Sequence, residues 1–356
     1  MLGGNQTQLK LQNRRQVLRE LYRLERTTRV ALATGTGLTK PTISSLVAEL
    51  IEEGLVTEDG LGRSTGQGGK RPTLLRFRPD ARQVIGVAVE RGKAVGVLAD
   101  LIGAVTARHA PELAPADAVA SIKAVAAALL PQLDAPLLGI AFAIPGQIDT
   151  AAGVIRRSVS LGLQDAAVEV GTQVPVWLAN YAELSALGQL AFGFEPAERP
   201  ASLVTVALDG QVELGVSLRF GADHFGSELA APLLAGIGLD AAGLDELLPA
   251  ADPDSCLLLR YRAGRGEAAA TAVLQELAER LARLCAWAVL IVRPERLSLG
   301  GRLADLGEEF LELLRMRMIH ELGEVPLPIV GTAHSEQLAA LGAAALVLQK
   351  ELGLLS

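Results

Sequence analysis

Apolar residues recur at helical spacing between residues 40 and 54 and define the clearest element of the chain. They fall at i, i+3, i+4, i+7 and i+8, as Ile43, Leu46, Val47, Leu50 and Ile51. This spacing places them on one face of a helix. Thr39 stands where a helix N-cap is expected, Pro41 lies in the first turn, and Gly54 follows the last apolar position. The pattern predicts a helix that begins within a residue or two of Lys40 and packs its apolar face against a core.

Two shorter patterns precede this helix and predict two more. Val17, Leu18, Leu21 and Tyr22 give an amphipathic helix from Asn13 onward. Thr28 is placed to cap a short helix over residues 29–34, and residues 35–37 form a turn. Three helices at this spacing match the helix-turn-helix plan, in which the third helix enters the major groove of DNA. Residues 1–12 are expected to form a loose leader.

A predicted hairpin follows the third helix. Residues 55–58 have strand character, residues 59–69 form a loop rich in Gly, Ser and Thr, and residues 72–77 form the return strand, which together make a β-wing. Five basic residues crowd it, namely Arg63, Lys70, Arg71, Arg76 and Arg78. The Lys70-Arg71 pair beside glycine is suited to lie along phosphates or to enter a narrow minor groove. A solvated basic hairpin is the alternative.

Beyond a boundary near residues 79–82, the pattern predicts a two-lobed α/β body. The expected elements are a three-stranded meander over 85–110, a helix over 116–130, strands at 138–143 and 174–178, a helix over 182–192, a hairpin of 203–208 with 212–220, helices from 267 and 303 around a strand at 297–299, and a last helix over 335–352. Meander, helix, strand and helix therefore occur twice, which indicates two lobes with mixed sheets.

Charge divides the chain in the same place. Residues 1–78 hold 13 Lys and Arg against 7 Asp and Glu, whereas the remainder holds 20 against 33. This asymmetry favours a nucleic-acid-binding head on an acidic body, because basic side chains that neutralise phosphates release counterions; ordinary surface charge is the alternative. Cys256 and Cys285 are too few for a disulfide framework. No apolar run approaches the ~20 residues that a bilayer needs, so we expect a cytoplasmic protein that does not enter a membrane.

Over residues 13–350 the chain resembles the ROK family of sugar-responsive repressors and sugar kinases. The head is similar to the winged helix-turn-helix of the repressor branch in NRRQVLRELYRL, GLTKPTISSLVAELIEEGLV and GGKRPTLLRF. The body is similar to the family's actin-like domain in IAFAIPGQID, LANYAELSALGQLAFG and LSLGGRLAD. The resemblance implies an α/β fold with a winged helix-turn-helix at 13–78 and an actin-like (ribonuclease H-like) two-lobed ROK domain at 82–356.

The body departs from the family's kinases at three positions. Tyr181 stands where the kinases carry an aspartate as general base, and a phenol with a pKa near ~10 is a poor base at neutral pH. Glu90 lies in the segment matching the first phosphate loop, where its charge would oppose phosphate. The second phosphate loop matches a plain hairpin at 207–210. We therefore expect no catalytic residues, no enzyme activity and no cofactor. An ATP-dependent sugar kinase carrying a DNA-binding head is the alternative.

The family's structural zinc site also lacks its ligands here. Ala231 stands at the position of the family's histidine, no Cys cluster follows, and His224 is a lone histidine. We expect no metal site.

Two groups of candidate binding residues follow. The expected DNA contacts are Thr39, Lys40, Pro41, Thr42, Ser44, Ser45, Arg63, Lys70 and Arg71. The candidate ligand residues are Asn180, Tyr181 and Glu228. In family members, the positions of Asn180 and Glu228 hydrogen-bond sugar hydroxyls. Asn180 is equally suited to cap the helix that follows it, and Glu228 to be a solvated loop acid.

The expected function is that of a sequence-specific DNA-binding transcriptional regulator, a repressor, whose body dimerises and senses a sugar or sugar phosphate. A homodimer, or a dimer of dimers, would place two recognition helices ~34–36 Å apart on an inverted-repeat operator in double-stranded DNA. A purely architectural DNA-binding protein with an inert body is a further alternative.

Overall fold

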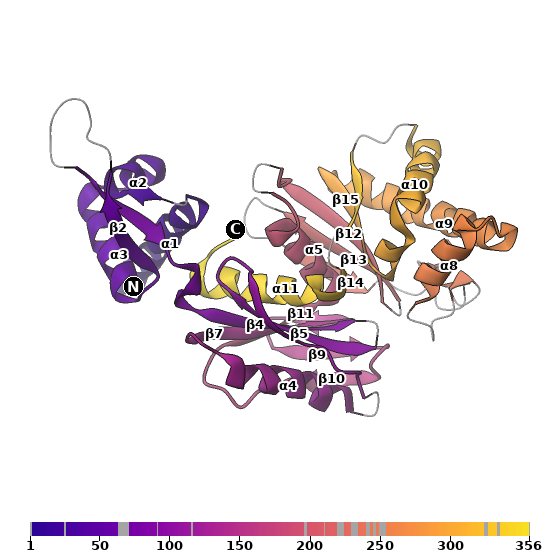
Figure 1. The fold of residues 1–356 in the computed structure, drawn as a ribbon, viewed down its shortest axis with the longest axis horizontal. Helices are drawn as coiled ribbons and strands as arrows, with labels where there is room; N and C mark the ends of the chain where they lie inside the picture. Colours follow the sequence, from indigo (N-terminus) through magenta and orange to yellow (C-terminus); the bar gives the residue numbers. More distant parts are fainter. Residues whose placement is uncertain are drawn as a thin grey trace.

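The computed structural model describes residues 2–24, 26–62, 71–90, 92–114, 117–195, 198–209, 211–218, 224–228, 234–239, 243–244, 247–248, 254–323, 327–332 and 335–355. The chain forms a head and two lobes (Figure 1). The head, drawn in indigo, projects from one side of the body, and the C-terminal segment runs back toward it.

The head combines three helices with a small sheet. The helices are α1 (Leu2–Arg23), α2 (Arg29–Thr36) and α3 (Lys40–Glu52). The sheet consists, in spatial order, of β1 (Thr27–Thr28), β3 (Thr73–Phe77) and β2 (Val56–Leu61). Strands β2 and β3 pair antiparallel and form the predicted wing.

Local capping signals set the helix starts that the sequence predicted. The Thr28 hydroxyl accepts a hydrogen bond from the Ala31 amide at 3.1 Å, and the Thr39 hydroxyl accepts one from the Thr42 amide at 3.4 Å. Each bond satisfies a first-turn amide that has no partner within its helix. The apolar face of α3 is buried, as predicted. Gly54 follows α3 with φ +78°, the conformation expected just beyond a helix end.

The first helix begins earlier than expected. The predicted loose leader over residues 1–12 is wrong from Leu2 onward, because α1 already starts there. Leu9 and Leu11 are 56% and 53% exposed, so this first half buries no apolar stripe that the sequence pattern could reveal. Lys10 Nζ lies 2.9 Å from Glu49 Oε1, an ion pair that ties this part of α1 to α3.

Lobe one is built on a five-stranded sheet in the order β11-β7-β4-β5-β6. Its strands are β4 (Gln83–Glu90), β5 (Lys93–Asp100), β6 (Val105–His109), β7 (Leu137–Ile144) and β11 (Val176–Asn180). Helix α4 (Ala118–Leu129) packs on one face of this sheet. Helix α11 (Ser335–Val347), which continues as a π-helical turn over Leu348–Leu352, packs on strands β4, β5 and β7 of the same sheet.

A second, three-stranded sheet in this lobe was not predicted. It consists of β8 (Gln147–Asp149), β9 (Val154–Ser158) and β10 (Leu163–Ala167), which pair antiparallel in the order β10-β9-β8. Its strands have three to five residues each, and their exposed and buried positions do not alternate. A period-2 pattern, the usual signal for a strand, is therefore missing from the sequence.

Lobe two repeats the strand plan of lobe one. Its sheet has the order β14-β13-β12-β15-β16. The strands are β12 (Ser202–Asp209), β13 (Gln211–Leu218), β14 (His224–Glu228), β15 (Arg296–Gly301) and β16 (Ile329–Gly331). Helices α8 (Ser255–Gly264), α9 (Ala268–Val292) and α10 (Gly307–Leu322) belong to the same lobe. In both sheets an antiparallel meander is extended by two parallel strands, which confirms the predicted duplication.

Helix α5 (Tyr181–Phe192) lies against the sheet of lobe two and packs along α11, so these two helices join the lobes. Their backbones approach so closely that a side chain would not fit between them. A Cβ atom on Gly342 would lie 1.7 Å from the Leu184 carbonyl oxygen, and one on Gly188 would lie 2.4 Å from the Leu338 carbonyl oxygen. We call this α5–α11 contact the interlobe seam.

The head is not packed as a separate body. Its buried residues, among them Leu18 and Leu50, belong to the same apolar cluster as Leu346 of α11 and Leu354 of the C-terminal segment. A short 3₁₀ turn over Pro79–Ala81 links β3 to β4 at the predicted boundary.

Candidate nucleic-acid interface and interlobe site

The N-terminal half of α3 presents a polar surface opposite its buried stripe. Thr39, Lys40, Pro41, Ser44 and Ser45 are exposed, and Thr42 is half-buried. The sequence therefore placed its candidate DNA contacts on the accessible side of the predicted helix. Ala48, one turn beyond Ser44, is also exposed and was not predicted. Its methyl group is of the kind that contacts thymine methyl groups in the major groove.

Hydrogen bonds order part of this surface. The hydroxyl oxygens of Thr39 and Thr42 lie 2.9 Å apart. The Ser45 hydroxyl donates to Glu49 Oε1 at 3.4 Å, and the same carboxylate carries the ion pair with Lys10. A carboxylate beside the groove-facing surface would repel phosphate, so Lys10 offsets the one acid nearest the candidate contacts on this turn.

Of the predicted wing contacts, Arg71 is exposed directly before Pro72. Arg63 and Lys70 lie outside the described residues.

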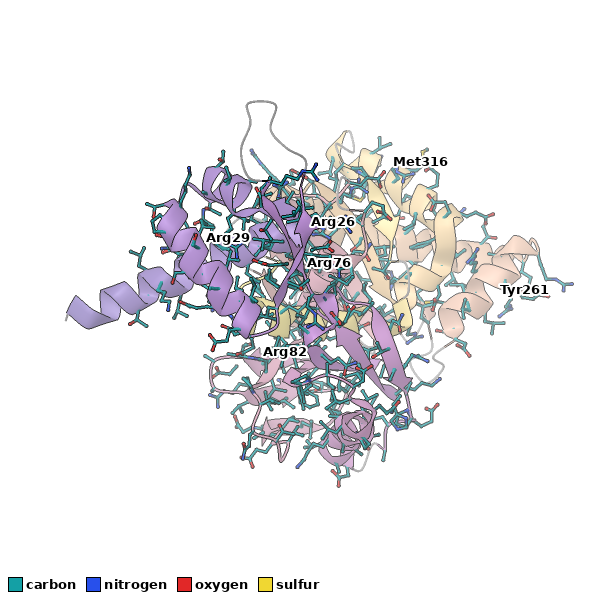
Figure 2. The ribbon with its side chains drawn as sticks, turned by 60° about the vertical axis from the view of Figure 1, so that its left-hand side comes forward. Arg26, Arg29, Arg76, Arg82, Tyr261 and Met316 are labelled. Atoms are coloured by element: carbon teal, nitrogen blue, oxygen red, sulfur yellow. The ribbon has the colours of Figure 1, made fainter. Side chains whose placement is uncertain are left out.

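Three arginines that were not among the predicted DNA contacts lie at the wing, and we call them the wing arginines: Arg26, Arg29 and Arg76 (Figure 2). Of these, only Arg76 was expected among the basic residues of the wing. Arg26 Nε lies 2.8 Å from Asp59 Oδ2, and Arg76 Nε lies 3.8 Å from the same oxygen. Arg29 Nη2 donates to Glu58 Oε1 at 2.9 Å. Arg26 and Arg76 keep more than half of their side-chain surface exposed. The cluster is thus a row of cations whose charge is partly neutralised by two acids of β2.

The sequence could not show this cluster because the pairing that builds it is two residues long. Strand β1 pairs antiparallel with β3, with Thr27 opposite Leu75, and this register brings residues 26 and 76 together. Two threonines do not form a recognisable strand pattern. The available signal was the run of basic residues around Thr27, at positions 23, 26 and 29.

Asn180, the first candidate ligand residue, is a buried N-cap in the structure. Its side-chain oxygen accepts hydrogen bonds from the amides of Ala182 and Glu183 at 2.9 and 3.1 Å, and its amide group donates to the Gly146 carbonyl at 2.8 Å. Only 2% of the residue is exposed. The bonds hold the start of α5 to the turn that follows β7, which is the structural alternative considered for this residue.

The other candidate residues do not open a pocket around Asn180. Tyr181, where the family's kinases carry the general base, is 1% exposed and packs within the apolar cluster. Glu228 ends β14, and its side chain lies outside the described residues. Among the described side chains, Asn180 and Tyr181 therefore meet packed atoms rather than open space.

The Pro145-Gly146 turn beside Asn180 is fixed by its own backbone. Gly146 has φ +125°, and a Cβ atom there would lie 2.2 Å from the Arg157 carbonyl oxygen, so only glycine fits. Asp149 accepts from the Ala152 amide at 2.9 Å and from Arg156 at 2.8 Å. The hydrogen bond from Arg156 holds the pKa of Asp149 below its usual value. Gly146 and Asp149 thus shape the turn.

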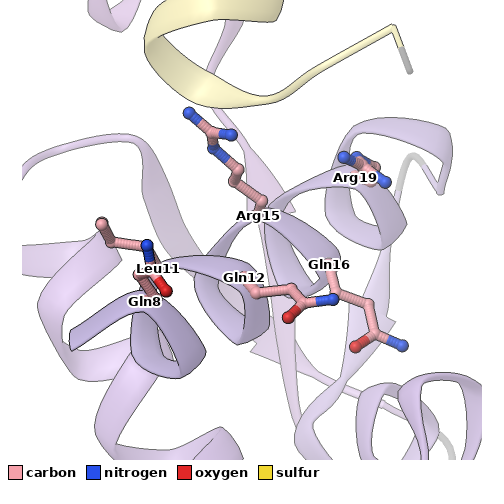
Figure 3. A pocket seen from close by; sticks show the side chains of 6 residues that line it. All are labelled: Gln8, Leu11, Gln12, Arg15, Gln16 and Arg19. Atoms are coloured by element: carbon pink, nitrogen blue, oxygen red, sulfur yellow. The ribbon is translucent and has the colours of Figure 1, made fainter. Parts of the chain in front are cut away.

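A groove of about 540 Å³ runs along α1, on the side that faces the C-terminal segment (Figure 3). Its lining side chains are Gln8, Leu11, Gln12, Arg15, Gln16 and Arg19. The groove lies at the junction of head and body, so it is separate from the candidate ligand residues between the lobes.

Among the described residues, no group of three or more His, Cys, Asp or Glu side chains is placed to hold a metal ion. In the same part of the chain, no helix combines the length and the apolar character needed to cross a bilayer. Cys256 and Cys285 are buried thiols, and burial raises the pKa of Cys285 to about 12.

The head matches a family model described as winged helix-turn-helix DNA-binding, over residues 10–57. The xylose repressor of Bacillus subtilis is 29% identical over 226 residues, which cover 60% of this chain and 57% of the repressor. The xylose repressor of Caldicellulosiruptor bescii is 29% identical over 201 residues, which cover 53% and 50%. The chain thus spans about half the length of the curated relatives it matches.

A solved ROK family transcriptional regulator, described as a homolog of the E. coli MLC protein, superimposes with a TM-score of 0.73 over 97% of this chain and 98% of its own, at 18% identity. The sequence of the head is thus similar to winged helix-turn-helix DNA-binding domains, and the fold of the whole chain is that of a solved ROK family transcriptional regulator. The predicted fold class is confirmed. The ROK-type body also superimposes on a glucokinase from Streptomyces griseus solved with glucose and AMPPNP, with a TM-score of 0.58 over 75% of this chain at 17% identity. The two curated relatives given above are named xylose repressors, whereas the body's fold is shared with kinases.

Proposed function

We propose that this protein is a DNA-binding transcriptional repressor that binds an inverted-repeat operator as a homodimer and transfers no phosphate. The observation that carries the proposal is the exposed N-terminal turn of α3, where Thr39, Lys40 and Ser44 lie on the side of the helix away from the buried residues Ile43, Leu46, Val47 and Leu50. A helix presented in this way beside a wing is suited to the major groove. Arg71 and the wing arginines extend the surface toward phosphates.

The experiment is a fluorescence anisotropy titration of a duplex across a range of salt concentrations. The logarithm of the association constant should fall linearly with the logarithm of the salt concentration. Lys40→Ala should make this slope shallower by about 0.9 if Lys40 neutralises one phosphate. Lys123→Ala, which removes the same charge from α4 on lobe one, is the matched control and should leave the slope unchanged. A salt-insensitive duplex affinity, or equal slopes for the two variants, would show that α3 does not bind DNA.

The dimer follows from the two-fold symmetry of an inverted repeat, because each half-site needs one recognition helix. Size-exclusion chromatography with light scattering gives the mass of the oligomer, and footprinting on the operator gives the spacing of the half-sites. A monomer that protects a single half-site would contradict this part of the proposal.

A carbohydrate is the proposed effector, with its site between the lobes near Asn180, Tyr181 and Glu228. The proposal is supported by the names of the xylose repressors and by the fold shared with a glucokinase solved with glucose. Because Asn180 and Tyr181 are packed, a sugar would need a more open arrangement of the lobes than the one described here. It would regulate DNA binding only if its affinity differs between the two arrangements.

Calorimetry with D-xylose, D-glucose and their phosphates tests the effector. Asn180→Ser is the appropriate variant, because serine keeps an N-cap acceptor for α5 and loses the amide group. Heat of binding that is unchanged in this variant would remove Asn180 from the site. A coupled ATP-turnover assay with the same sugars separately tests the kinase alternative, and clear turnover would contradict the reading of Tyr181.

A further inference from the structure

The C-terminal segment, residues 348–355, lies between the head and lobe one, and its two sides contact different parts of the molecule. We call it the C-terminal strut. It continues α11 through a π-helical turn and ends with Leu352 and Leu354 buried in the cluster shared with the head. Figure 1 shows it leaving α11 and running toward the head.

On the head side, two arginines of α1 bind the strut through its main chain. Arg15 Nη2 donates to the Lys350 carbonyl at 3.1 Å, and Arg19 Nε donates to the Gly353 carbonyl at 2.6 Å. Figure 3 shows Arg15 pointing from α1 toward the C-terminal ribbon. Because the acceptors are carbonyls at the end of a helix, guanidinium donors both satisfy them and suit their partial negative charge.

On the lobe side, the strut holds Trp177 of β11. The indole Nε1 donates to Glu351 Oε1 at 2.9 Å, and Lys350 Nζ lies 5.7 Å from the centre of the indole ring. Trp177 is three residues before Asn180, the residue that caps α5. Lys350 therefore contacts α1 through its carbonyl and β11 through its ammonium group.

The middle of α11 is fixed at the interlobe seam. The close backbone contact of Gly342 with Leu184 leaves no room for α11 to slide along α5. A Cβ atom on Gly86 of β4 would likewise lie 1.9 Å from the Ala340 carbonyl oxygen. A displacement of α5 or β11 is thus passed to α11 and the strut rather than absorbed by loosely packed side chains.

We infer that the C-terminal strut sets the orientation of the DNA-binding head on lobe one and carries movements of β11 and α5 to it. The inference rests on the proposed function, since it names the route by which a ligand between the lobes would alter the spacing of two recognition helices. The strut has to differ in its contacts between the two arrangements for this coupling to exist.

The test measures the distance between the head and lobe one in the full chain by double electron–electron resonance. Spin labels are attached at Thr34→Cys on α2 and Ala124→Cys on α4, both exposed positions. The native thiols Cys256 and Cys285 are buried and should not take the label. The parent protein should give one narrow distance distribution.

Two variants break the strut on opposite sides. In Gly353→Ala, the new Cβ would lie 2.5 Å from Cγ and Cδ of Arg15, which must leave the Lys350 carbonyl. In Trp177→Phe, the donor to Glu351 is lost. The control is Gly323→Ala, which also places alanine at a positive φ, 82°, but with no atom within 4 Å. Both strut variants should at least double the width of the distribution, while the control should match the parent.

A width in Gly353→Ala and Trp177→Phe equal to that of Gly323→Ala would overturn the inference. DNA titrations of the same proteins with and without D-xylose give the functional arm. The strut variants should keep duplex affinity within about threefold and lose any change in affinity that the sugar causes in the parent, because about 5–150-fold changes are typical of such coupling. A parent that does not bind DNA would disprove the proposed function, while the distance measurement would still decide the role of the strut.

Discussion

Neutralising the two acids beside the wing arginines should strengthen DNA binding. In the free protein, Asp59 pairs with Arg26 and Arg76, and Glu58 pairs with Arg29. A duplex that lies against these arginines would meet the two carboxylates just behind them. The variant Glu58→Gln with Asp59→Asn keeps the shape of the side chains, keeps hydrogen-bond acceptors for the arginines and removes both negative charges.

The size of the effect follows from Coulomb's law. An acid and a phosphate separated by about 7 Å, with an arginine between them, repel by roughly 0.6 kcal/mol in the dielectric of water. Two such pairs give about 1.2 kcal/mol, or roughly sevenfold in affinity at low salt. Screening at 0.1 M salt, where the Debye length is about 10 Å, reduces this to about threefold. Loss of the exposed ion pairs should cost the fold no more than about 1 kcal/mol each.

The assay is the anisotropy titration at two salt concentrations, with any duplex long enough to cover the head. Glu112→Gln is the control, since this exposed acid is paired with Lys93 on lobe one. It removes one negative charge far from the wing, whereas the double variant removes two beside it. The double variant should bind more tightly than Glu112→Gln, with the gap shrinking at high salt. Weaker binding, or a gain that salt does not reduce, would refute the placement of the wing arginines against phosphates.

Three further predictions concern the fold. Gly342→Ala should lower the free energy of unfolding by about 3 kcal/mol in urea titrations, because the new Cβ would clash with the backbone of α5. Gly264→Ala, where no atom lies within 4 Å of the new Cβ, should change this free energy by no more than about 1 kcal/mol. Similar values for the two variants would contradict the interlobe seam. Asn180→Ala should cost about 2–3 kcal/mol, because the N-cap of α5 and the hydrogen bond to the Gly146 carbonyl are both lost. A loss below 0.5 kcal/mol, taken as roughly the error of such titrations, would rule out the cap as a stabilising element. Cys256 and Cys285 should not react with Ellman's reagent at pH 8 until denaturant is added, because both thiols are buried. Burial also raises the pKa of Cys285 to about 12, which disfavours the reactive thiolate. Fast reaction of the native protein would show that lobe two opens locally.

Elements whose signals are local were predictable from the sequence. Thr28 and Thr39 accept hydrogen bonds within three residues, so the starts of α2 and α3 could be read from neighbouring residues alone. The five strands of the large sheet of lobe one were predicted in outline, and so were β12, β13 and β15 of lobe two, because long apolar strands and Ala-rich helices alternate in the same order twice. The edge strands β14 and β16 of lobe two were not predicted. Strands that depend on distant partners were missed: β1 has two residues, and β8, β9 and β10 lack an alternating pattern.

The candidate site likewise has a part that local sequence patterns predict and a part that depends on distant partners. The α3 surface follows from helix periodicity, which also fixes which side chains are exposed. The wing arginines needed the register of β1 with β3, and the sequence does not specify it. For Asn180 the sequence left two roles open, and only the bond to the Gly146 carbonyl across 34 residues shows how its amide group is used.

The seam between the lobes has a consequence for how such a protein can diversify. Where α5 meets α11, the contact is made by main-chain atoms at Gly188 and Gly342. It does not depend on the identity of any side chain. Mutation elsewhere can therefore change the side chains between the lobes without disturbing this backbone contact. Substitution of either glycine would instead force the two helices apart, because the new Cβ would overlap the backbone of the other helix.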